Sequence, residues 1–343
     1  MKVSFNEIIG QDFVLEALKR TVRSREIGHA YLFSGPAGSG KKTLALLFAQ
    51  SLNCSNELEI PCQQCLPCRK ILSGNYPDLY IIKPEGASIK IGQLRELKES
   101  LYLLSGEGRK KICIIYDTEL LTLPAANSLL KILEEPPQDL VFILLSARPW
   151  DLPPTVISRC THFSLKPLAG EKVKQILEKH DFLNPEEREI IVALAGGNPG
   201  KGLEMASRGG WENKYKEAFL LVKRIEDGPA EDIINKAEEF SRRNDLQEIL
   251  ELLLLIYRDR LVFKLSGHSG NAFIKSLMKP NNKVKDETSI NTGTISVREE
   301  EQKNAFFLEK VYRALLQLQG ELQHNINPRL AVEALFLKMR GVV

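Results

Sequence analysis

Long apolar runs are missing from this sequence of 343 residues. The most apolar stretches, residues 140–145 and 252–257, fall far short of the roughly 18 residues that are needed to span a bilayer. The first residues also lack the charged and then apolar pattern of a secretory leader, and Asp12 and Glu16 follow soon after. These absences predict a cytoplasmic protein without membrane contact.

A strong excess of one charge is missing as well. The chain carries 47 Lys and Arg against 44 Asp and Glu, which gives a formal net charge of +3. A protein that binds a polyanion by itself usually has a larger basic excess. Any contact with nucleic acid is therefore expected to be local or shared with partners.

Cysteine is scarce and unevenly distributed, which argues against a disulfide framework. Four of the six cysteines lie in one 15-residue window: Cys54, Cys62, Cys65 and Cys68. Four thiolates suit a closed tetrahedral zinc site with a structural task. An iron–sulfur cluster is the competing interpretation, because the last three of these cysteines match the start of a ferredoxin-type run. We favour zinc, since the sequence has no other redox feature.

The chain length predicts two or three domains at roughly 150 residues each. Strand-like runs at residues 31–34, 79–82, 111–116 and 140–146 alternate with helical patterns at residues 91–104 and 124–133. Such alternation predicts a parallel sheet that is covered by helices. We assign residues 1–166 to this α/β domain, with a metal module inserted at about residues 54–68.

Helical patterns alone follow the α/β domain. A glycine-rich turn at residues 196–200 divides a small helical domain at residues 167–211, and residues 212–343 form a helical carboxyl-terminal domain. Asn327 and Pro328 read as the N-cap and first turn of the last helix. Residues 279–300 are polar, lack aromatic side chains and are expected to form a loop.

A phosphate-binding loop is predicted between the first strand and the helix that follows it. Residues 35–41, with Gly35, Gly38, Gly40 and Lys41, fit the first seven positions of GxxxxGK[ST]. The glycines allow backbone N–H groups to turn toward phosphate oxygens at a helix start, and the lysine adds positive charge. This loop can hold phosphate.

Two parts of an ATPase are altered around this loop. The eighth motif position, where a hydroxyl should coordinate Mg²⁺, is Lys42, and Thr43 points about 100° away along the helix. Asp117 ends an apolar strand as a Mg²⁺-site acid should, but Thr118 follows it where related ATPases carry a water-orienting glutamate, and Glu119 comes one place later. The loop is therefore expected to be poor at hydrolysis, and the sequence leaves open whether it retains ATP.

The ordered motifs resemble bacterial DNA polymerase III clamp-loader subunits, which are AAA+ proteins, and within them the delta-prime type. The resemblance spans residues 5 to about 165. It is carried by Gly10-Gln11, the phosphate loop, the block at residues 126–137, the triplet Ser158-Arg159-Cys160 and the run Tyr76-Pro77-Asp78-Leu79. A weaker likeness continues at residues 327–330.

The resemblance implies a subunit of a five-membered ring that opens a sliding clamp and closes it on primed DNA. It implies tau/gamma and delta subunits as partners, a zinc module after the first helix of the phosphate loop, and a collar made by the carboxyl-terminal helices. In such rings the Ser-Arg-Cys arginine reaches the ATP site of the adjacent subunit, and Arg159 occupies the matching position. A guanidinium supplied in trans stabilises charge that develops on the transferred phosphoryl group.

Two other functions stay open at this point. An ATP-hydrolysing tau/gamma-like motor subunit would need Thr43 and Glu119 to replace the missing residues. A zinc-dependent nucleic-acid binder with a relict phosphate loop is weakened by the small net charge of +3.

Overall fold

The structure, a computed structural model, describes residues 4–101, 109–179, 183–229, 231–266, 294–322 and 327–341. The chain divides into two compact units, and each is described by itself. Unit 1 contains Met1–Lys179 and Gly196–Leu203, and unit 2 contains His180–Ala195 and Glu204–Val343. The division into domains at residues 1–166, 167–211 and 212–343 stays a prediction.

Unit 1 is built on a five-stranded parallel sheet with the strand order β2-β3-β4-β1-β5. The strands are β1 Ala30–Ser34, β2 Leu79–Ile82, β3 Lys111–Ile115, β4 Leu140–Ser146 and β5 Thr161–Ser164. The parallel α/β fold predicted from the sequence is thereby confirmed. The prediction omitted β5, because only Phe163 of its four residues is buried and no apolar run marks the strand.

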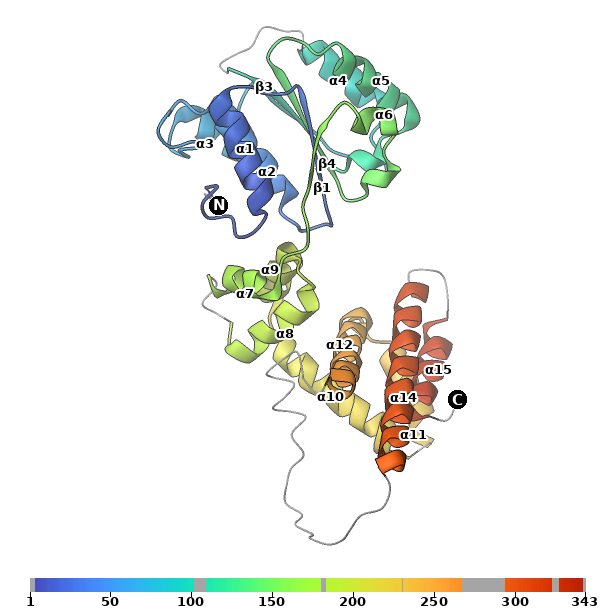
Figure 1. Cartoon of the computed structure of the whole chain (residues 1–343). Coiled ribbons are helices and arrows are strands. Elements are labelled where there is room, and N and C mark those ends of the chain that lie inside the picture. The colour runs from blue at the N-terminus through green and yellow to red at the C-terminus, as the bar shows by residue number, and fades with distance from the viewer. Residues whose placement is uncertain are drawn as a thin grey trace. The chain divides into compact units, whose positions relative to one another are not determined.

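Helices cover both faces of this sheet (Figure 1). One face packs against α1 Asp12–Ser24, α2 Lys41–Asn53 and α3 Leu66–Ser73. The other face packs against α4 Ile91–Leu101, α5 Leu123–Glu134 and α6 Pro154–Ile157. Alternate residues of the central strands enter the two cores, as in β3, where Ile112 and Ile114 belong to one core and Cys113 and Ile115 to the other.

The strand order places the predicted phosphate-site residues at one edge of the sheet. The carboxyl ends of parallel strands share an edge, and open α/β sheets bind ligands there. The loop of residues 35–40 follows β1, Asp117 follows β3, and Ala147 follows β4. A short 3-10 helix, η1 Thr118–Leu120, begins directly after Asp117, and η2 Pro149–Asp151 follows β4.

The rest of the described chain is helical, as the sequence predicts. The helices are α7 Gly170–Glu178, α8 Pro185–Ala195, α9 Pro199–Arg208, α10 Trp211–Asp227, α11 Glu231–Ser241, α12 Leu246–Ser266, α14 Thr294–Glu321 and α15 Pro328–Arg340. In unit 2, α12 packs against α10 and α14, and α15 packs against α10, α11 and α14. Buried Tyr215, Tyr257 and Phe336 contribute large side chains to its interior.

Two local predictions have different outcomes. The predicted N-cap is confirmed, because the Asn327 side chain accepts a hydrogen bond from the Arg329 N–H at 3.1 Å. Residues 279–293 of the predicted loop lie outside the described residues, whereas residues 294–300 begin α14, so that part of the prediction was wrong. Arg, Glu and Gln at residues 298–302 favour a helix by intrinsic propensity. Among the described residues, the helices are too short or too polar to cross a membrane.

Candidate functional site

The phosphate loop leaves β1 and turns directly into α2. Gly38 and Gly40 adopt φ angles of 79° and 94°, in the left-handed region that glycine enters without strain. A Cβ atom on Gly38 would also clash with Oδ1 of Asn198. The glycine at position 38 is therefore required both by its backbone angle and by a close neighbour.

That neighbour belongs to the turn before α9, within unit 1. The Asn198 side-chain amide donates to the carbonyl oxygen of Ala37, and the Gly200 N–H donates to the carbonyl oxygen of Gly38 at 3.0 Å. Asn198 Oδ1 also accepts from the Lys201 N–H at 3.0 Å. These bonds use carbonyl groups of the phosphate loop, so they do not consume the N–H groups that a phosphate would need.

Lys41 is folded back onto the loop that precedes it. Its Nζ donates to the carbonyl oxygens of Gly35 at 2.6 Å and Pro36 at 3.0 Å. Burial lowers the pKa of Lys41, and the negative charges of Glu119 and Asp117 oppose that shift. The Lys41 ammonium at the carboxyl edge of the sheet is thus within range of the negative charge of two carboxylates.

Lys42, at the motif's eighth position, is exposed and turns toward the aromatic ring of Tyr116. Its Nζ lies 4.9 Å from the ring centroid, and Lys83 Nζ lies 5.6 Å from the same centroid. Contacts of this length are favourable cation–π interactions. Thr43 is exposed one residue further along α2. The position that should offer a hydroxyl to Mg²⁺ therefore carries an ammonium group.

The residues after β3 have three different environments. Asp117 has a left-handed φ of 47° and precedes η1. Thr118 is fully buried, and its hydroxyl lies 3.0 Å from the Leu145 carbonyl oxygen and 3.2 Å from that of Ile115. Glu119 accepts the Ala147 N–H at 3.0 Å through Oε1, and its Oε2 is buried with no partner within the described residues. Thr118 thus faces the protein interior, whereas the negative charge of Glu119 acts on Lys41.

Arg159 lies at the opposite edge of the sheet from this site. Arg159 precedes β5, so it lies at the amino edge, where the parallel strands begin. β5 pairs in parallel with β1, and the phosphate loop follows the end of β1 at the carboxyl edge. The side chain of Arg159 is 34% exposed. Its guanidinium donates to Glu134 Oε1 at 2.7 Å and to the Thr155 carbonyl oxygen at 2.9 Å. Arg159 is therefore remote from the phosphate loop of its own chain.

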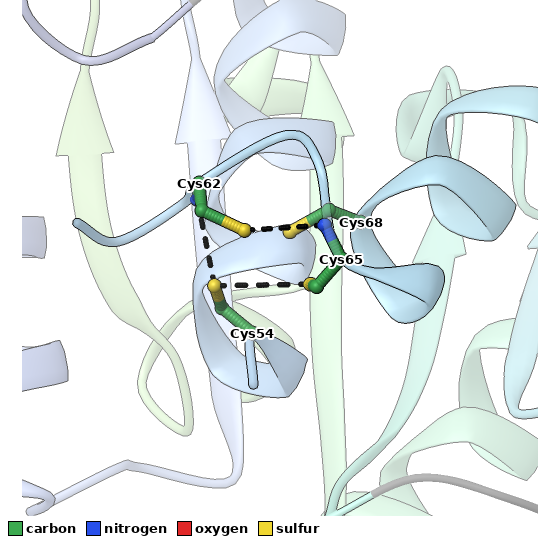
Figure 2. Close-up of side chains that lie close together, drawn as sticks. All are labelled: Cys54, Cys62, Cys65 and Cys68. Atoms are coloured by element: carbon green, nitrogen blue, oxygen red, sulfur yellow. Dashed lines mark hydrogen bonds between the residues drawn. The ribbon is translucent and has the colours of Figure 1, made fainter. Parts of the chain in front are cut away.

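The four clustered cysteines converge at the junction of α2 and α3 (Figure 2). Cys54 follows α2, Cys65 precedes α3 and Cys68 lies within α3. The four Sγ atoms all lie within 4.8 Å of one another, and those of Cys54 and Cys65 are 4.0 Å apart. Tetrahedral zinc with bonds of about 2.3 Å requires sulfur atoms about 3.8 Å apart. The cluster is thus close to the size of a zinc site.

Backbone N–H groups point at these sulfur atoms, as a thiolate site requires. The Cys62 N–H donates to Cys54 Sγ at 3.4 Å, and the Cys65 N–H donates to Cys62 Sγ at 3.3 Å. Burial acts to raise the pKa of Cys65, but hydrogen bonds from the Ser55 and Cys68 backbone outweigh it and lower that pKa to about 6. Burial raises the pKa of Cys68, which a metal would reverse, because it binds the thiolate. The donor set fits a metal ion with four thiolate ligands.

Comparisons with known proteins agree with this geometry. Residues 10–169 match the family described as "DNA polymerase III, delta subunit". The chain is 32% identical over 272 residues to DNA polymerase III subunit delta' of Bacillus subtilis, covering 78% of this chain and 82% of that protein. The chain belongs to the delta-prime family of DNA polymerase III subunits. The predicted family, replication context and AAA+ fold are thereby confirmed.

Tau and gamma subunits of DNA polymerase III are almost as similar to this delta-prime family member. DNA polymerase III subunit tau of Bacillus subtilis is 29% identical over 284 residues, covering 76% of this chain and 50% of that protein. DNA polymerase III subunit gamma of Buchnera aphidicola is 28% identical over 361 residues, covering 98% of this chain and 94% of that protein. Overall sequence identity therefore distinguishes poorly between the delta-prime and tau/gamma subunits, and individual residues have to be compared.

The structure brings most of the predicted site residues of this delta-prime family member into two groups. The phosphate-site group lies at the carboxyl edge of the sheet: Gly35, Gly38, Gly40, Lys41, Lys42, Thr43 and Asp117. The four cysteines form the second group, and Arg159 belongs to neither. Three contacts were not predicted from the sequence, namely those of Asn198 with the loop, Glu119 with Ala147 and Glu134 with Arg159. Each joins residues 25 or more positions apart, so no local pattern could have revealed it.

Proposed function

We propose that this chain is a delta-prime-type stator of a DNA polymerase III clamp loader. In this proposal it does not hydrolyse ATP itself, and it supplies Arg159 in trans to the ATP site of a neighbouring motor subunit. The observation that carries the proposal is the contrast between a phosphate loop without a magnesium ligand at its eighth position and a partly exposed arginine that is remote from that loop.

The environment of Lys42 supports the absence of hydrolysis. P-loop ATPases hold Mg²⁺ through a Ser or Thr hydroxyl at this position and use the ion to neutralise charge on the β- and γ-phosphates. An ammonium group has no lone pair with which to ligate a cation. The contact of Lys42 with Tyr116 is consistent with a side chain that has a different partner.

The environment of Thr118 supports the same conclusion independently. Its hydroxyl is bonded to carbonyl oxygens inside the sheet, and the side chain is fully buried. No carboxylate is present at this position to orient an attacking water. Two elements of the hydrolytic machinery are thus altered on two different segments of the chain.

The place of Arg159 supports a role in trans. A guanidinium at the amino edge of the sheet is separated from its own phosphate loop by the length of the β5 and β1 pairing, four residues or about 13 Å at 3.3 Å per residue. Arginine stabilises a phosphoryl transition state only when it reaches the phosphate oxygens. A second subunit that docks at the amino edge would bring its ATP to Arg159.

The assembly that we propose contains tau/gamma motor subunits and a delta subunit in a hetero-pentamer. It acts on a sliding clamp and on primer–template DNA, and the helices of residues 212–343 serve as the collar that joins the subunits. Zinc is the metal that we propose for Cys54, Cys62, Cys65 and Cys68, as a structural ion, because four thiolates leave no open position for water. ATP in the chain's own loop is not required.

A motor subunit of the same loader is the second candidate. Glu119 favours it, because this carboxylate lies at the ends of β3 and β4 and acts on the charge of Lys41. The intact first seven positions of the phosphate loop and the similarity to tau also favour it. Against it, Oε1 of Glu119 already accepts the Ala147 N–H.

Steady-state ATP hydrolysis distinguishes the two candidates. The assay compares the isolated chain with Mg²⁺, the reconstituted loader, and the loader that contains Arg159→Ala. We expect a silent isolated chain and a loader whose DNA-stimulated hydrolysis falls when Arg159 is replaced. Turnover by the isolated chain would instead establish the motor function, and an unchanged rate with Arg159→Ala would remove the role in trans.

A further inference from the structure

The last residue of α5, Glu134, is placed where it disfavours its own helix. A carboxylate at a helix carboxyl terminus meets the negative end of the helix macrodipole. Glu134 is 51% exposed, so it is not needed to fill the core. Its presence at this position therefore requires an explanation other than the stability of α5.

The contact that Glu134 makes is with Arg159. Glu134 Oε1 accepts a hydrogen bond from Arg159 Nη2 at 2.7 Å, which is the length of a strong charge-assisted bond. The carbonyl oxygen of Thr155, in α6, accepts from Arg159 Nη1 at 2.9 Å. Each terminal nitrogen of the guanidinium is thus held by a different element.

Both of these elements are fixed by the same core. Leu133, next to Glu134, and Val156, next to Thr155, are buried in the apolar cluster on one face of the sheet. The helices α5 and α6 contact each other there (Figure 1). Two hydrogen-bond acceptors on rigid, mutually packed elements define the orientation of a planar guanidinium.

The guanidinium keeps donors for a ligand. An arginine carries five N–H donors, and the described residues provide partners for two of them. The side chain is 34% exposed, so the remaining donors have access to solvent. An oriented and partly open guanidinium is preorganised for an incoming phosphate oxygen.

We propose that Glu134 is a positioning residue that holds Arg159 in the orientation in which it meets the phosphate oxygens of ATP bound to the neighbouring subunit. The inference rests on the proposed role of Arg159 in trans. Glu134 does not touch the nucleotide, and its contribution reaches the reaction only through the guanidinium. An arginine that is already oriented loses less conformational entropy when it engages the transition state.

The test uses the reconstituted loader with ATP and primed DNA. Its variants carry Glu134→Gln, Arg159→Ala or both. Glu135→Gln is the matched control, because Glu135 is the neighbouring exposed carboxylate, and the carboxylate that holds Arg159 is that of Glu134. Glutamine keeps the size of the side chain and removes its charge. We expect Glu134→Gln to lower the turnover number about two- to fivefold at an unchanged KM for ATP, because a partly exposed ion pair orders its partner only modestly. Glu135→Gln should behave like the unmodified loader.

The double variant separates positioning from a general structural role. If Glu134 acts through Arg159, adding Glu134→Gln to Arg159→Ala changes nothing further, since interacting residues are not additive. A full additional loss in the double variant, an unchanged rate with Glu134→Gln, or a faster rate with it would each overturn the inference. If Arg159→Ala itself has no effect, the proposed function fails and this inference falls with it, whereas a strong effect of Arg159→Ala beside an inert Glu134→Gln removes this inference alone.

Discussion

Loss of a metal from the four-cysteine site is expected to unfold a small part of this protein and leave the sheet intact. The metal module has almost no apolar core of its own. Cys54, Cys62 and Cys68 are buried, and among the described apolar residues Ile60 and Cys65 pack against them. By contrast, Ile71 of α3 belongs to the large core beneath the sheet. Metal removal should therefore release the segment between α2 and α3 and not the helices themselves.

The free energy needed to order this segment follows from its length. Residues 55–65 are 11 residues, and fixing each backbone costs about 1 kcal/mol, or about 11 kcal/mol in total. The partial burial of Ile60 returns at most about 2 kcal/mol. Structural zinc contributes about 10 to 16 kcal/mol in small thiolate sites at neutral pH. A zinc ion at the four cysteines would therefore supply the free energy that orders this segment.

Amide hydrogen exchange with and without a chelator measures this effect. We expect residues 55–65 to lose their protection when the metal is removed, while β1, β3 and β4 keep theirs. The variant Cys65→Ser should reproduce the change, and Cys160→Ser, outside the cluster, is the control. Metal analysis of the purified chain should find one zinc per chain. Unchanged protection after verified metal loss would refute the reasoning, and iron with sulfide would replace zinc by an iron–sulfur cluster.

Three further predictions concern stability, each measured by urea denaturation. Thr118→Glu should destabilise the chain by about 3 to 5 kcal/mol, because it places a carboxylate at a fully buried position; full stability would show that Thr118 does not face the interior. Gly38→Ala should lower the free energy of unfolding by at least about 1 to 2 kcal/mol for its left-handed φ alone. The control is Gly92→Ala, where a Cβ meets open space, and it should not lower the stability. Equal stabilities of the two variants would contradict the left-handed turn at Gly38. Hydrogen bonds from Arg243 lower the pKa of Asp245, so the native state binds protons less readily than the unfolded state. This stabilisation is present above about pH 4 and is lost as pH falls through the lower native pKa, and Asp245→Asn should flatten the acid limb of the stability profile.

The sheet and its covering helices were predictable because burial imposes a local pattern. Strands such as β3 and β4 are buried along their whole length and appear in the sequence as unbroken apolar runs. β5 is an edge strand with three exposed residues, so its sequence contains no such run. Only the pairing of β5 with β1 defines it as a strand, and that pairing is a tertiary interaction.

The candidate site was predictable only as far as its residues follow one another in the chain. The phosphate loop and the cysteine cluster are local motifs, and their spacing alone indicated their chemistry. The contacts of Arg159 with Glu134 and of Asn198 with the loop cross 25 and 161 positions. Such pairs depend on how helices pack on the sheet, which a single sequence does not encode in any periodic pattern.

The central claim is that Arg159 acts on ATP that is bound by another subunit. Single-turnover hydrolysis by the loader, with this subunit carrying either Arg159 or Arg159→Ala, tests it most directly. We expect the rate of the chemical step at the adjoining site to fall about a thousandfold or more while ATP affinity is retained, as for other arginines supplied in trans. An equal rate in both assemblies, or hydrolysis by the isolated chain, would contradict it.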